Sequence, residues 1–273
     1  MLLGIDVSKW QGDMDWHKAR SAGARFAFIR AGSISTLGEL YTDYKFERNA
    51  RIAPDFFPIG FYWYFRPNFD AVKQANYFCS LIRGQRWLLP PVLDLETTGD
   101  QSSEEITDAA SQFLYQVYAR LSAWSLLYSR ALWLNANTVP DDIWAMVDLW
   151  VARYINLSGP WSDGKCKPRD FDKWLFWQKS AGGNGLGSRF GAKSRSIDIT
   201  YFNGDQAAFD HYAGVKNTGL VRVTASLAAS LRSSPEGAAI GATWKGAVWP
   251  VTETAGDFYK VEGWLHKDKV EKI

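Results

Sequence analysis

The alternation of strand and helix patterns along the chain is the sequence feature that most restricts its fold. Short apolar runs bounded by Gly, Pro or polar residues are typical of buried strands, and each of the first five is followed by a helical segment. The eight predicted strands are residues 3–7, 25–31, 59–65, 88–96, 124–128, 149–154, 174–178 and 196–201. Such alternation favours a parallel sheet closed into a barrel, and the last three strands lack crossover helices. We therefore predict an α/β fold, an irregular TIM-like (β/α)5(β)3 barrel.

Two carboxyl groups end the fourth predicted strand. Residues 88–96 read Leu-Leu-Pro-Pro-Val-Leu-Asp-Leu-Glu, and Asp94 and Glu96 are two positions apart, so both side chains point to the same face of a strand. Two close carboxyl groups in a dry setting push each other's pKa values apart, which leaves one protonated and one ionised near neutral pH. Such a pair can hydrolyse a glycosidic bond. A strand that merely ends in solvent-exposed acids is the alternative.

Further acids and aromatic residues fall at the ends of other predicted strands. In parallel barrels the chemistry lies at the carboxyl ends of the strands, where side chains from different strands meet. The residues predicted there are Asp6, Arg30, Tyr62, Tyr64, Asp94, Glu96, Tyr128, Tyr154, Gln178 and Asp198. Chance would rarely bring four acids to one mouth, so we predict a functional site at this end.

The last part of the chain has a different pattern. After residues 216–219, which have the composition of a linker, short strands alternate with Gly and Ser turns, and no helix is needed. We predict two domains, a larger barrel over residues 1–214 and a small all-β barrel over residues 215–273.

The composition limits the classes of partner. A formal net charge of +2 over 273 residues is too small to predict nucleic-acid binding, and no run of eighteen apolar residues predicts a membrane span. Aromatic residues make up 15% of the chain, which is typical both of sugar-binding clefts and of an aromatic-rich core. Cys79 and Cys166 form no ligand pair, so we expect free thiols, no metal and no cofactor.

Several motifs together resemble one known family. Residues 4–12, Gly-Ile-Asp-Val-Ser-Lys-Trp-Gln-Gly, resemble the opening of the glycoside hydrolase family 25 muramidases, the lysozymes of bacteria and phages. The Asp-Leu-Glu of residues 94–96, residues 149–154, residues 177–180 and residues 197–198 follow in the family's order and spacing. The match spans about residues 1–212, and the family's fold agrees with the strand count above.

The C-terminal part resembles a second kind of module. Residues 230–235, Ser-Leu-Arg-Ser-Ser-Pro, and residues 263–266, Gly-Trp-Leu-His, are similar to segments of bacterial SH3-type cell-wall modules. The resemblance implies an SH3-like cell-wall-binding domain. A spacer that only stabilises the enzyme is the alternative.

The family resemblance implies a peptidoglycan hydrolase, an N-acetylmuramidase or lysozyme that cleaves the β-1,4 bond between N-acetylmuramic acid and N-acetylglucosamine. Glu96 is the expected general acid, with its pKa raised by burial and nearby carboxylates, and Asp94 is expected to stay ionised. Asp94 would then either stabilise the oxocarbenium-like transition state or orient the substrate's 2-acetamido group. Asp6 and Asp198 would become neighbours on barrel closure and hold the proton of Glu96 or bind sugar hydroxyls. A structural ion pair between Asp6 and Arg30 is the competing interpretation.

Other residues near the same mouth are expected to bind the sugar chain. These candidates are Tyr62, Tyr128, Trp150, Tyr154, Trp177, Gln178 and Arg30. The resemblance favours stacking of the rings on sugar faces, but each single ring fits core packing equally well, because barrel strands alternate inward and outward.

Three other functions fit the sequence less well. A zinc amidase needs His or Cys ligands, and only His17, His211 and His266 occur. A chitinase-like glycosidase on the same barrel would carry further aspartates before Asp94, where residues 90–92 are Pro-Pro-Val. A non-catalytic glycan-binding protein would not need all four acids.

The expected partner is bacterial peptidoglycan, as substrate and as wall ligand, and we expect a monomer. The first residues lack the charged and long apolar regions of a signal peptide. We therefore expect a bacteriolytic phage endolysin that stays in the host cytoplasm before its release to the cell wall. A secreted extracellular enzyme of cell wall catabolism, without its leader, is the alternative.

Overall fold

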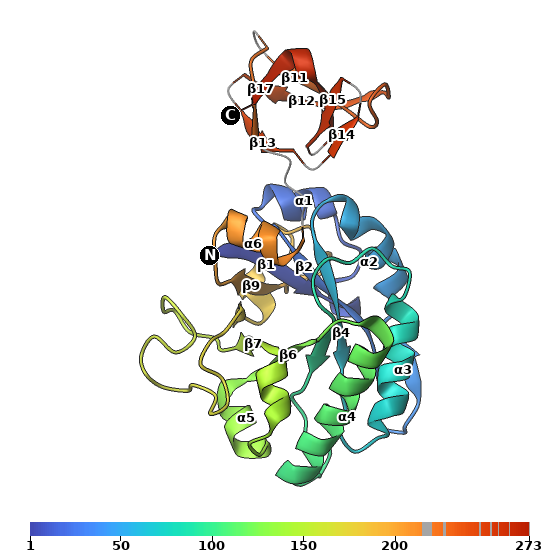
Figure 1. The fold of residues 1–273 in the computed structure, drawn as a ribbon, viewed down its shortest axis with the longest axis vertical. Helices are drawn as coiled ribbons and strands as arrows, with labels where there is room; N and C mark the ends of the chain where they lie inside the picture. The colour runs from blue at the N-terminus through green and yellow to red at the C-terminus, as the bar shows by residue number, and fades with distance from the viewer. Residues whose placement is uncertain are drawn as a thin grey trace. The chain divides into compact units, whose positions relative to one another are not determined.

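The computed structural model describes residues 1–214, 220–225, 228–245, 247–251, 253–255, 257–261 and 263–272. The chain divides into two compact units, Met1–Gln206 and Ala207–Ile273 (Figure 1). The predicted boundary at residue 214 lies further along the chain, and the predicted linker of residues 216–219 lies outside the described residues. No helix in the described parts of the chain is both long and apolar enough to cross a membrane.

Eight strands of the first unit close into a barrel. In pairing order they are β1 (Leu2–Val7), β2 (Ala27–Ile34), β4 (Ile59–Tyr64), β5 (Val92–Asp94), β6 (Leu126–Arg130), β7 (Asp148–Ala152), β8 (Phe176–Ser180) and β9 (Asp198–Phe202), which pairs back with β1. The seven strands from β1 to β8 run parallel. The predicted eight-stranded α/β barrel is therefore confirmed.

One strand direction differs from the prediction of a parallel sheet. Strand β9 runs antiparallel to both of its neighbours, β8 and β1. Residues 181–197, which connect β8 to β9, contain only the short 3₁₀ helix η4 (Gly182–Gly185) and no crossover helix. Antiparallel neighbours can be joined by a loop alone, and the connection of residues 181–197 is of this kind.

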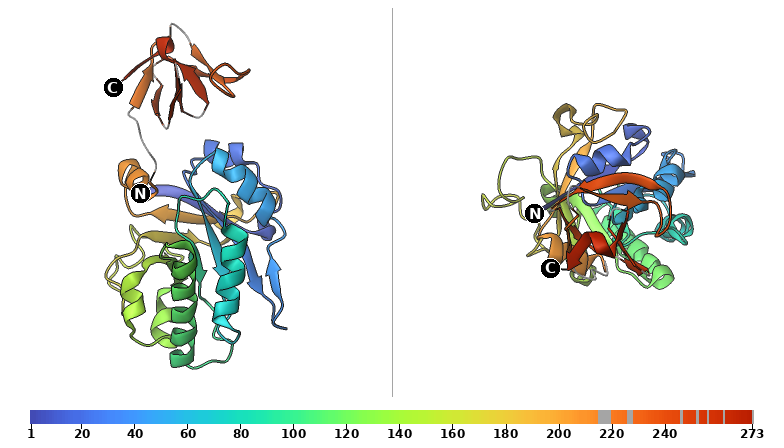
Figure 2. Two further views of the ribbon diagram at one scale, coloured as in Figure 1. Left: turned by 45° about the vertical axis from the view of Figure 1, so that its right-hand side comes forward. Right: turned by 90° about the horizontal axis from the view of Figure 1, so that it is seen from above.

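Five helices lie on the outside of the barrel (Figures 1 and 2). They are α1 (Trp16–Ser21), α2 (Phe46–Ile52), α3 (Ala71–Ile82), α4 (Ser103–Leu121) and α5 (Ala131–Asn137). Helix α4 begins with a capping box, in which Ser102 Oγ accepts a hydrogen bond from Glu105 N and the Glu105 carboxylate accepts one from Ser102 N. Before α2 the chain also forms β3 (Leu40–Thr42), which pairs antiparallel with the end of β2.

Aromatic rings fill the inside of the barrel. Phe28 stacks on Trp150 with 4.4 Å between ring centroids and packs edge-on against Phe176 at 5.1 Å. Gly60 leaves room for this packing, because a Cβ atom there would lie 2.6 Å from the Phe28 ring. The rings plug the barrel, and Trp150 lines the pocket above them.

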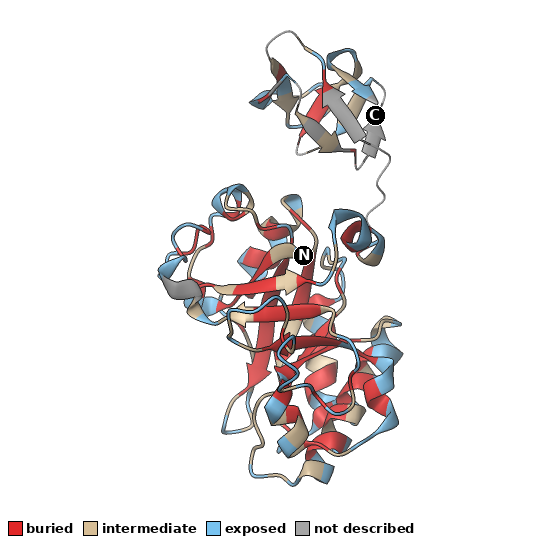
Figure 3. Cartoon of the chain, turned by 90° about the vertical axis from the view of Figure 1, so that its left-hand side faces the viewer, coloured by how far each residue is buried: buried red, intermediate tan, exposed pale blue. Residues whose placement is uncertain are grey.

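A second core lies between the strands and the outer helices. In β4 the side chains alternate, so that Phe61 and Trp63 join this outer core while Tyr62 and Tyr64 line the pocket. The Trp63 indole donates a hydrogen bond to Gln74 on α3 at 3.1 Å. Figure 3 shows the result, with buried strands and helices that expose one side. Cys79 and Cys166 are both free, as predicted.

The second unit contains two small sheets. One is formed by β13 (Val248–Pro250), β10 (Leu220–Val223) and β17 (Val270–Lys272). The other is formed by β12 (Ala239–Trp244), β11 (Ala228–Arg232), β16 (Trp264–His266), β15 (Phe258–Lys260) and β14 (Glu253–Ala255). The buried core of the second unit includes Val223, Ala229 and Leu265. Helix α6 (Gln206–Tyr212) precedes these strands, and the 3₁₀ helix η5 (Lys267–Lys269) lies between β16 and β17.

Candidate active site

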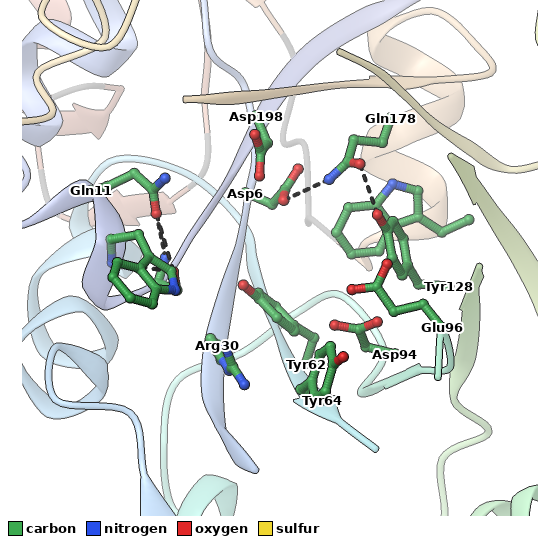
Figure 4. Close-up of a pocket in the computed structure, with 13 residues that line it drawn as sticks. Asp6, Gln11, Arg30, Tyr62, Tyr64, Asp94, Glu96, Tyr128, Gln178 and Asp198 are labelled. Carbon is green, nitrogen blue, oxygen red and sulfur yellow. Dashed lines mark hydrogen bonds between the residues drawn. The ribbon is translucent and has the colours of Figure 1, made fainter. Parts of the chain in front are cut away.

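A pocket of about 310 Å³ opens at the carboxyl ends of the parallel strands. Its lining residues are Asp6, Ser8, Trp10, Gln11, Arg30, Tyr62, Tyr64, Asp94, Glu96, Tyr128, Trp150, Gln178 and Asp198 (Figure 4). Because β9 runs antiparallel, its first residue, Asp198, reaches the same mouth as Asp6 near the end of β1. The structure therefore brings the four predicted acids into one pocket.

Asp6 is held by neutral hydrogen-bond donors. Gln178 Nε2 donates to Asp6 Oδ1 at 2.9 Å, and the Thr200 hydroxyl donates to Asp6 Oδ2 at 3.0 Å. Asp198 accepts a hydrogen bond from the Gly182 backbone N–H at 2.6 Å. Figure 4 shows the Asp198 carboxyl group directed toward Asp6. These contacts fix both acids on the β1 and β9 side of the pocket.

The orientation of Gln178 follows from two tyrosines. The hydroxyl groups of Tyr128 and Tyr154 both donate to Gln178 Oε1, at 2.8 Å and 2.9 Å. Because the amide oxygen is occupied in this way, the amide nitrogen is left to face Asp6. Gln178 is thus a positioning residue for Asp6, and its amide is already engaged without substrate.

Asp94 and Glu96 occupy the opposite side of the pocket, at and just after the end of β5. Asp94 is 5% exposed, whereas Glu96 is only partly buried. Figure 4 shows the two carboxyl groups next to each other. The prediction that both side chains leave the strand toward one face is therefore confirmed.

Burial raises the pKa of all four acids. For Asp6 the carboxylate of Asp198 adds to the rise, and for Asp94 the carboxylate of Glu96 does so. Burial also raises the pKa of Glu96 and of Asp198, and the hydrogen bond from Gly182 opposes the rise at Asp198. Like charges in a poorly hydrated pocket cannot all be ionised, so the cluster retains protons at a higher pH than isolated acids would.

The surroundings of Asp94 oppose its ionisation. Burial raises the pKa of Asp94 well above its ordinary value, and Arg30 opposes this rise. Asp94 Oδ1 is buried and has no hydrogen-bond partner among the described residues, which disfavours the charged form. We therefore treat Asp94 and Glu96 as a pair that shares one proton.

The predicted sugar-binding residues separate into two groups. Tyr62, Tyr128 and Trp150 line the pocket, but Trp150 is 2% exposed and packs in the aromatic plug. Tyr154 lies outside the pocket lining, is 52% exposed and is tied to the site through Gln178. Trp177 is fully buried and donates to the backbone oxygen of Arg153 at 2.8 Å, so the prediction that it stacks on sugar is wrong.

Four lining residues were not among the predicted sugar-binding or catalytic residues. Trp10 is 69% exposed, and Tyr64 adds a second ring at the end of β4. Ser8 and Gln11 form a capping box around the 3₁₀ helix η1 (Lys9–Gln11), which presents Trp10. The Ser-x-x-Gln spacing is a signal that could have indicated this exposed turn.

Arg30 does not pair with Asp6. Its terminal Nη2 donates to the Tyr41 hydroxyl at 3.2 Å, and its guanidinium lies 5.0 Å from the centre of the Tyr64 ring. The oxygen atoms of Asp6 instead accept hydrogen bonds from Gln178 and Thr200. The competing interpretation of a structural Asp6–Arg30 ion pair is therefore wrong.

Among the described residues no group of His, Cys, Asp and Glu is arranged to hold a metal ion.

Comparisons with known proteins agree on one family. The family model described as glycosyl hydrolases family 25 matches residues 5–187. The chain is 34% identical to Lysozyme M1 of Streptomyces globisporus over 218 residues, which cover 75% of this chain and 68% of that protein. It is 30% identical to the N,O-diacetylmuramidase of Chalaropsis over 151 residues, which cover 50% of this chain and 69% of that protein.

A solved structure gives the same result. The bacterial lysozyme from Streptomyces coelicolor superposes with a TM-score of 0.65 at 30% identity, over 78% of this chain and 96% of that one. The matched family region includes Asp6, Asp94 and Glu96 but ends before Asp198.

Proposed function

The chain belongs to glycosyl hydrolases family 25 and is a glycoside hydrolase of the lysozyme type. We propose that it cleaves the β-1,4 bond between N-acetylmuramic acid and N-acetylglucosamine in peptidoglycan. The observation that carries the proposal is the meeting of Asp6, Asp94, Glu96 and Asp198 in one pocket at the mouth of the barrel.

Glu96 is the proposed general acid. It is the less buried member of the Asp94–Glu96 pair, so its carboxyl group has the better access to the oxygen of the leaving sugar. Burial raises its pKa, which keeps a proton available for transfer to that oxygen. When Glu96 holds the shared proton, Asp94 carries the negative charge.

Asp94 is proposed to stabilise the positive charge that develops on the sugar in the transition state. As the glycosidic bond breaks, the anomeric carbon becomes oxocarbenium-like, and a carboxylate beside it stabilises that charge. The same carboxylate could instead orient the 2-acetamido group of the substrate. Asp6 and Asp198, on the facing side, bind sugar hydroxyls or influence the proton on Glu96 through their charges.

The test of this proposal is the product of the reaction. Purified peptidoglycan is digested with the wild-type enzyme, Glu96→Gln and the exposed control Glu104→Gln, and the fragments are identified by mass spectrometry after reduction. We expect new reducing ends on N-acetylmuramic acid from the wild type and the control. Glu96→Gln should be slower by about two to four orders of magnitude with an unchanged melting temperature. New reducing ends on N-acetylglucosamine, or an active Glu96→Gln, would contradict the proposal.

For the second unit we propose an SH3-like domain that binds the bacterial cell wall. The resemblance of residues 230–235 and 263–266 to wall-binding modules supports this, and these residues lie in and around β11 and β16. The expected result is that Glu96→Gln enzyme sediments with intact cell walls, and that the same variant without residues 207–273 does so much less. Equal sedimentation would favour a spacer that only stabilises the enzyme.

We further propose that the protein is a monomeric phage endolysin, on the basis of the resemblance of its motifs to bacterial and phage lysozymes. An endolysin made in the cytoplasm should lyse its host only after the membrane is permeabilised. Lysis that needs no permeabilisation would contradict this, and light scattering of the purified protein tests the monomer.

A further inference from the structure

We propose that a row of alternating cations and aromatic rings along one side of the pocket binds a carboxylate group carried by the glycan substrate. We call this row the cation–aromatic rim. Its members are Trp10, Lys9, Tyr41, Arg30, Tyr64 and Arg66. The inference rests on the proposed function, because it concerns the substrate of the same pocket.

The first half of the rim joins η1 to the β2–β3 hairpin. Lys9 Nζ lies 5.0 Å from the centre of the Trp10 ring and 5.9 Å from that of Tyr41. The Tyr41 hydroxyl in turn accepts a hydrogen bond from Arg30 Nη2 at 3.2 Å. One cation thus lies near the ring of Tyr41, and a second contacts its hydroxyl group.

The second half continues to the end of β4. The Arg30 guanidinium lies 5.0 Å from the centre of the Tyr64 ring, and the Arg66 guanidinium lies 5.5 Å from it. Arg66 Nε donates to the backbone oxygen of Ile34 at 3.0 Å, and this hydrogen bond orients the guanidinium group. The rim is carried by η1 after β1, by β2 and its partner β3, and by the end of β4 with the residues just after it. Strands β1, β2 and β4 are consecutive around the barrel. The rim therefore runs along one continuous edge.

The rim is part of the pocket and not a separate surface. Trp10, Arg30 and Tyr64 line the pocket, and Lys9 precedes Trp10 in the same 3₁₀ helix. Figure 4 shows Arg30 on β2 near Tyr62 and Tyr64 of β4, on the Asp94 side of the pocket. A glycan bound at the acids would reach the rim with its substituents.

The cations of the rim lie against aromatic rings. On the described part of the chain, Lys9, Arg30 and Arg66 make no ion pair with a carboxylate. By contrast, the carboxylate of Asp13 makes ion pairs with both Lys45, at 2.7 Å, and Lys193, at 3.4 Å. Aromatic faces hold a cation in place but do not neutralise it. Arg30 also interacts with the charges of Asp94 and Asp43, so the rim offers its positive charge to a ligand chiefly at Lys9 and Arg66.

A buried donor points to the same conclusion. Arg30 Nε is buried and has no hydrogen-bond partner within the described residues. A guanidinium presents its N–H groups in a fork that matches the two oxygen atoms of a carboxylate. The negative charge at the pocket acids would repel an anionic ligand, and the three rim cations offset this repulsion on one side only.

The chemistry of the substrate supplies a carboxylate. In peptidoglycan the lactyl group of muramic acid is either a free carboxylate or is extended by a peptide that carries carboxylates. Chitin has the same sugar backbone bonds and no charge. Recognition of a carboxylate by the rim would therefore favour peptidoglycan over chitin at a step that precedes bond cleavage.

Binding of three disaccharides tests the inference. They are the N-acetylglucosaminyl-N-acetylmuramyl peptide, the same disaccharide with a free lactyl group, and chitobiose. None of them contains the bond that the proposed activity cleaves, so calorimetry with the active enzyme measures binding alone. The variants are Lys9→Met, Lys9→Glu and the matched control Lys73→Met, which removes an exposed cation from α3.

We expect Lys9→Met to weaken binding of a carboxylate-bearing disaccharide about threefold to tenfold and Lys9→Glu to weaken it further, with chitobiose and Lys73→Met unaffected. Loss confined to the peptide form identifies peptide carboxylates as the ligand, and loss confined to the free lactyl form identifies that group. Unchanged binding by Lys9→Met, or equal losses for chitobiose, would overturn the inference. A chain that binds in this way but releases no muramic-acid reducing ends would overturn only the proposed function.

Discussion

Asp6 and Asp198 stand directly opposite each other on the antiparallel strands β1 and β9. The pairing places two carboxyl groups side by side in a largely buried position, where burial and mutual repulsion raise the pKa of Asp6 well above its ordinary value. Burial also raises the pKa of Asp198, and hydrogen bonds from the Gly182 backbone and from Asp6 oppose this rise. The pair therefore lowers the stability of the fold at high pH, where both groups must ionise.

The first prediction follows from this pair. An acid whose pKa is higher in the folded than in the unfolded state lowers stability as pH rises from about 4, the unfolded value, through the folded one. Asp198→Asn removes one charge and lowers the pKa of Asp6, so the free energy of unfolding of the variant should fall less as pH rises. At pH 8 we expect the free energy of unfolding of the variant to exceed that of the wild type by about 1 kcal/mol, with a large loss of activity. Urea unfolding at pH 5 and pH 8 measures this, and the exposed Asp108→Asn should match the wild type.

The second prediction concerns the pH dependence of the reaction. Burial raises the pKa of Glu96, and the nearby Arg130 guanidinium lowers it. Because Glu96 acts as the protonated acid, activity should fall on the alkaline side as it ionises. Arg130→Gln removes the opposing charge and should move this alkaline limb of kcat/KM to higher pH. Arg51→Gln, an exposed change on α2, should leave the limb in place, and a shift to lower pH would exclude Glu96 as the acid.

The third prediction contrasts two tryptophans. Trp10 is 69% exposed at the pocket, whereas Trp177 is fully buried and bonded to the Arg153 backbone. Trp10→Ala should raise KM about fivefold to tenfold, since a ring that packs on a ligand contributes about 1 kcal/mol, and leave stability unchanged. Trp177→Phe should lower the free energy of unfolding by about 1–3 kcal/mol and leave KM unchanged. The opposite pattern would mean that the two roles are exchanged.

The fourth prediction concerns Gln178 as a positioning residue. Gln178→Leu leaves the Tyr128 and Tyr154 hydroxyl groups without their acceptor and removes a donor from Asp6. We expect kcat to fall about 10-fold to 100-fold with little change in KM, because Asp6 loses its fixed orientation. Tyr154→Phe removes only one of the two bonds to Gln178 and should cost much less. A rise in KM without a change in kcat would instead indicate direct substrate binding by Gln178.

Much of the barrel and its acids could be predicted because both depend on local pattern. Asp94 and Glu96 follow an apolar run at a spacing of two, and the strand period alone places them on one face. Asp6 could be assigned to the mouth because it lies near the end of the first strand, whereas Asp198, the first residue of β9, reaches that mouth only because β9 runs antiparallel. The direction of β9 could not be read from the strand itself, because side chains alternate in the same way in parallel and antiparallel strands.

The errors at the site arise from side-chain direction and exposure. Trp177 and Gln178 are consecutive in β8, so only one of them can face the pocket, and the alternation could have excluded Trp177. For Trp10 the Ser-x-x-Gln spacing could have indicated the turn, but the exposure of its ring depends on how η1 leaves β1. The burial of Asp94 depends on neighbours from several strands, so the rise in its pKa could not be predicted from the sequence around it.

Closure of the barrel through β9 has a consequence for the time at which the enzyme becomes active. Thr200 and Asp6, which are bonded to each other, are 194 residues apart in the sequence. During synthesis β1 leaves the ribosome first, and Asp6 lacks its partners on β9 until almost the whole first unit has been translated. Contacts of such long range form late in folding. A nascent chain that stops before β9 therefore has Asp94 and Glu96 in an unclosed ring, without the strand that carries Asp198 and Thr200.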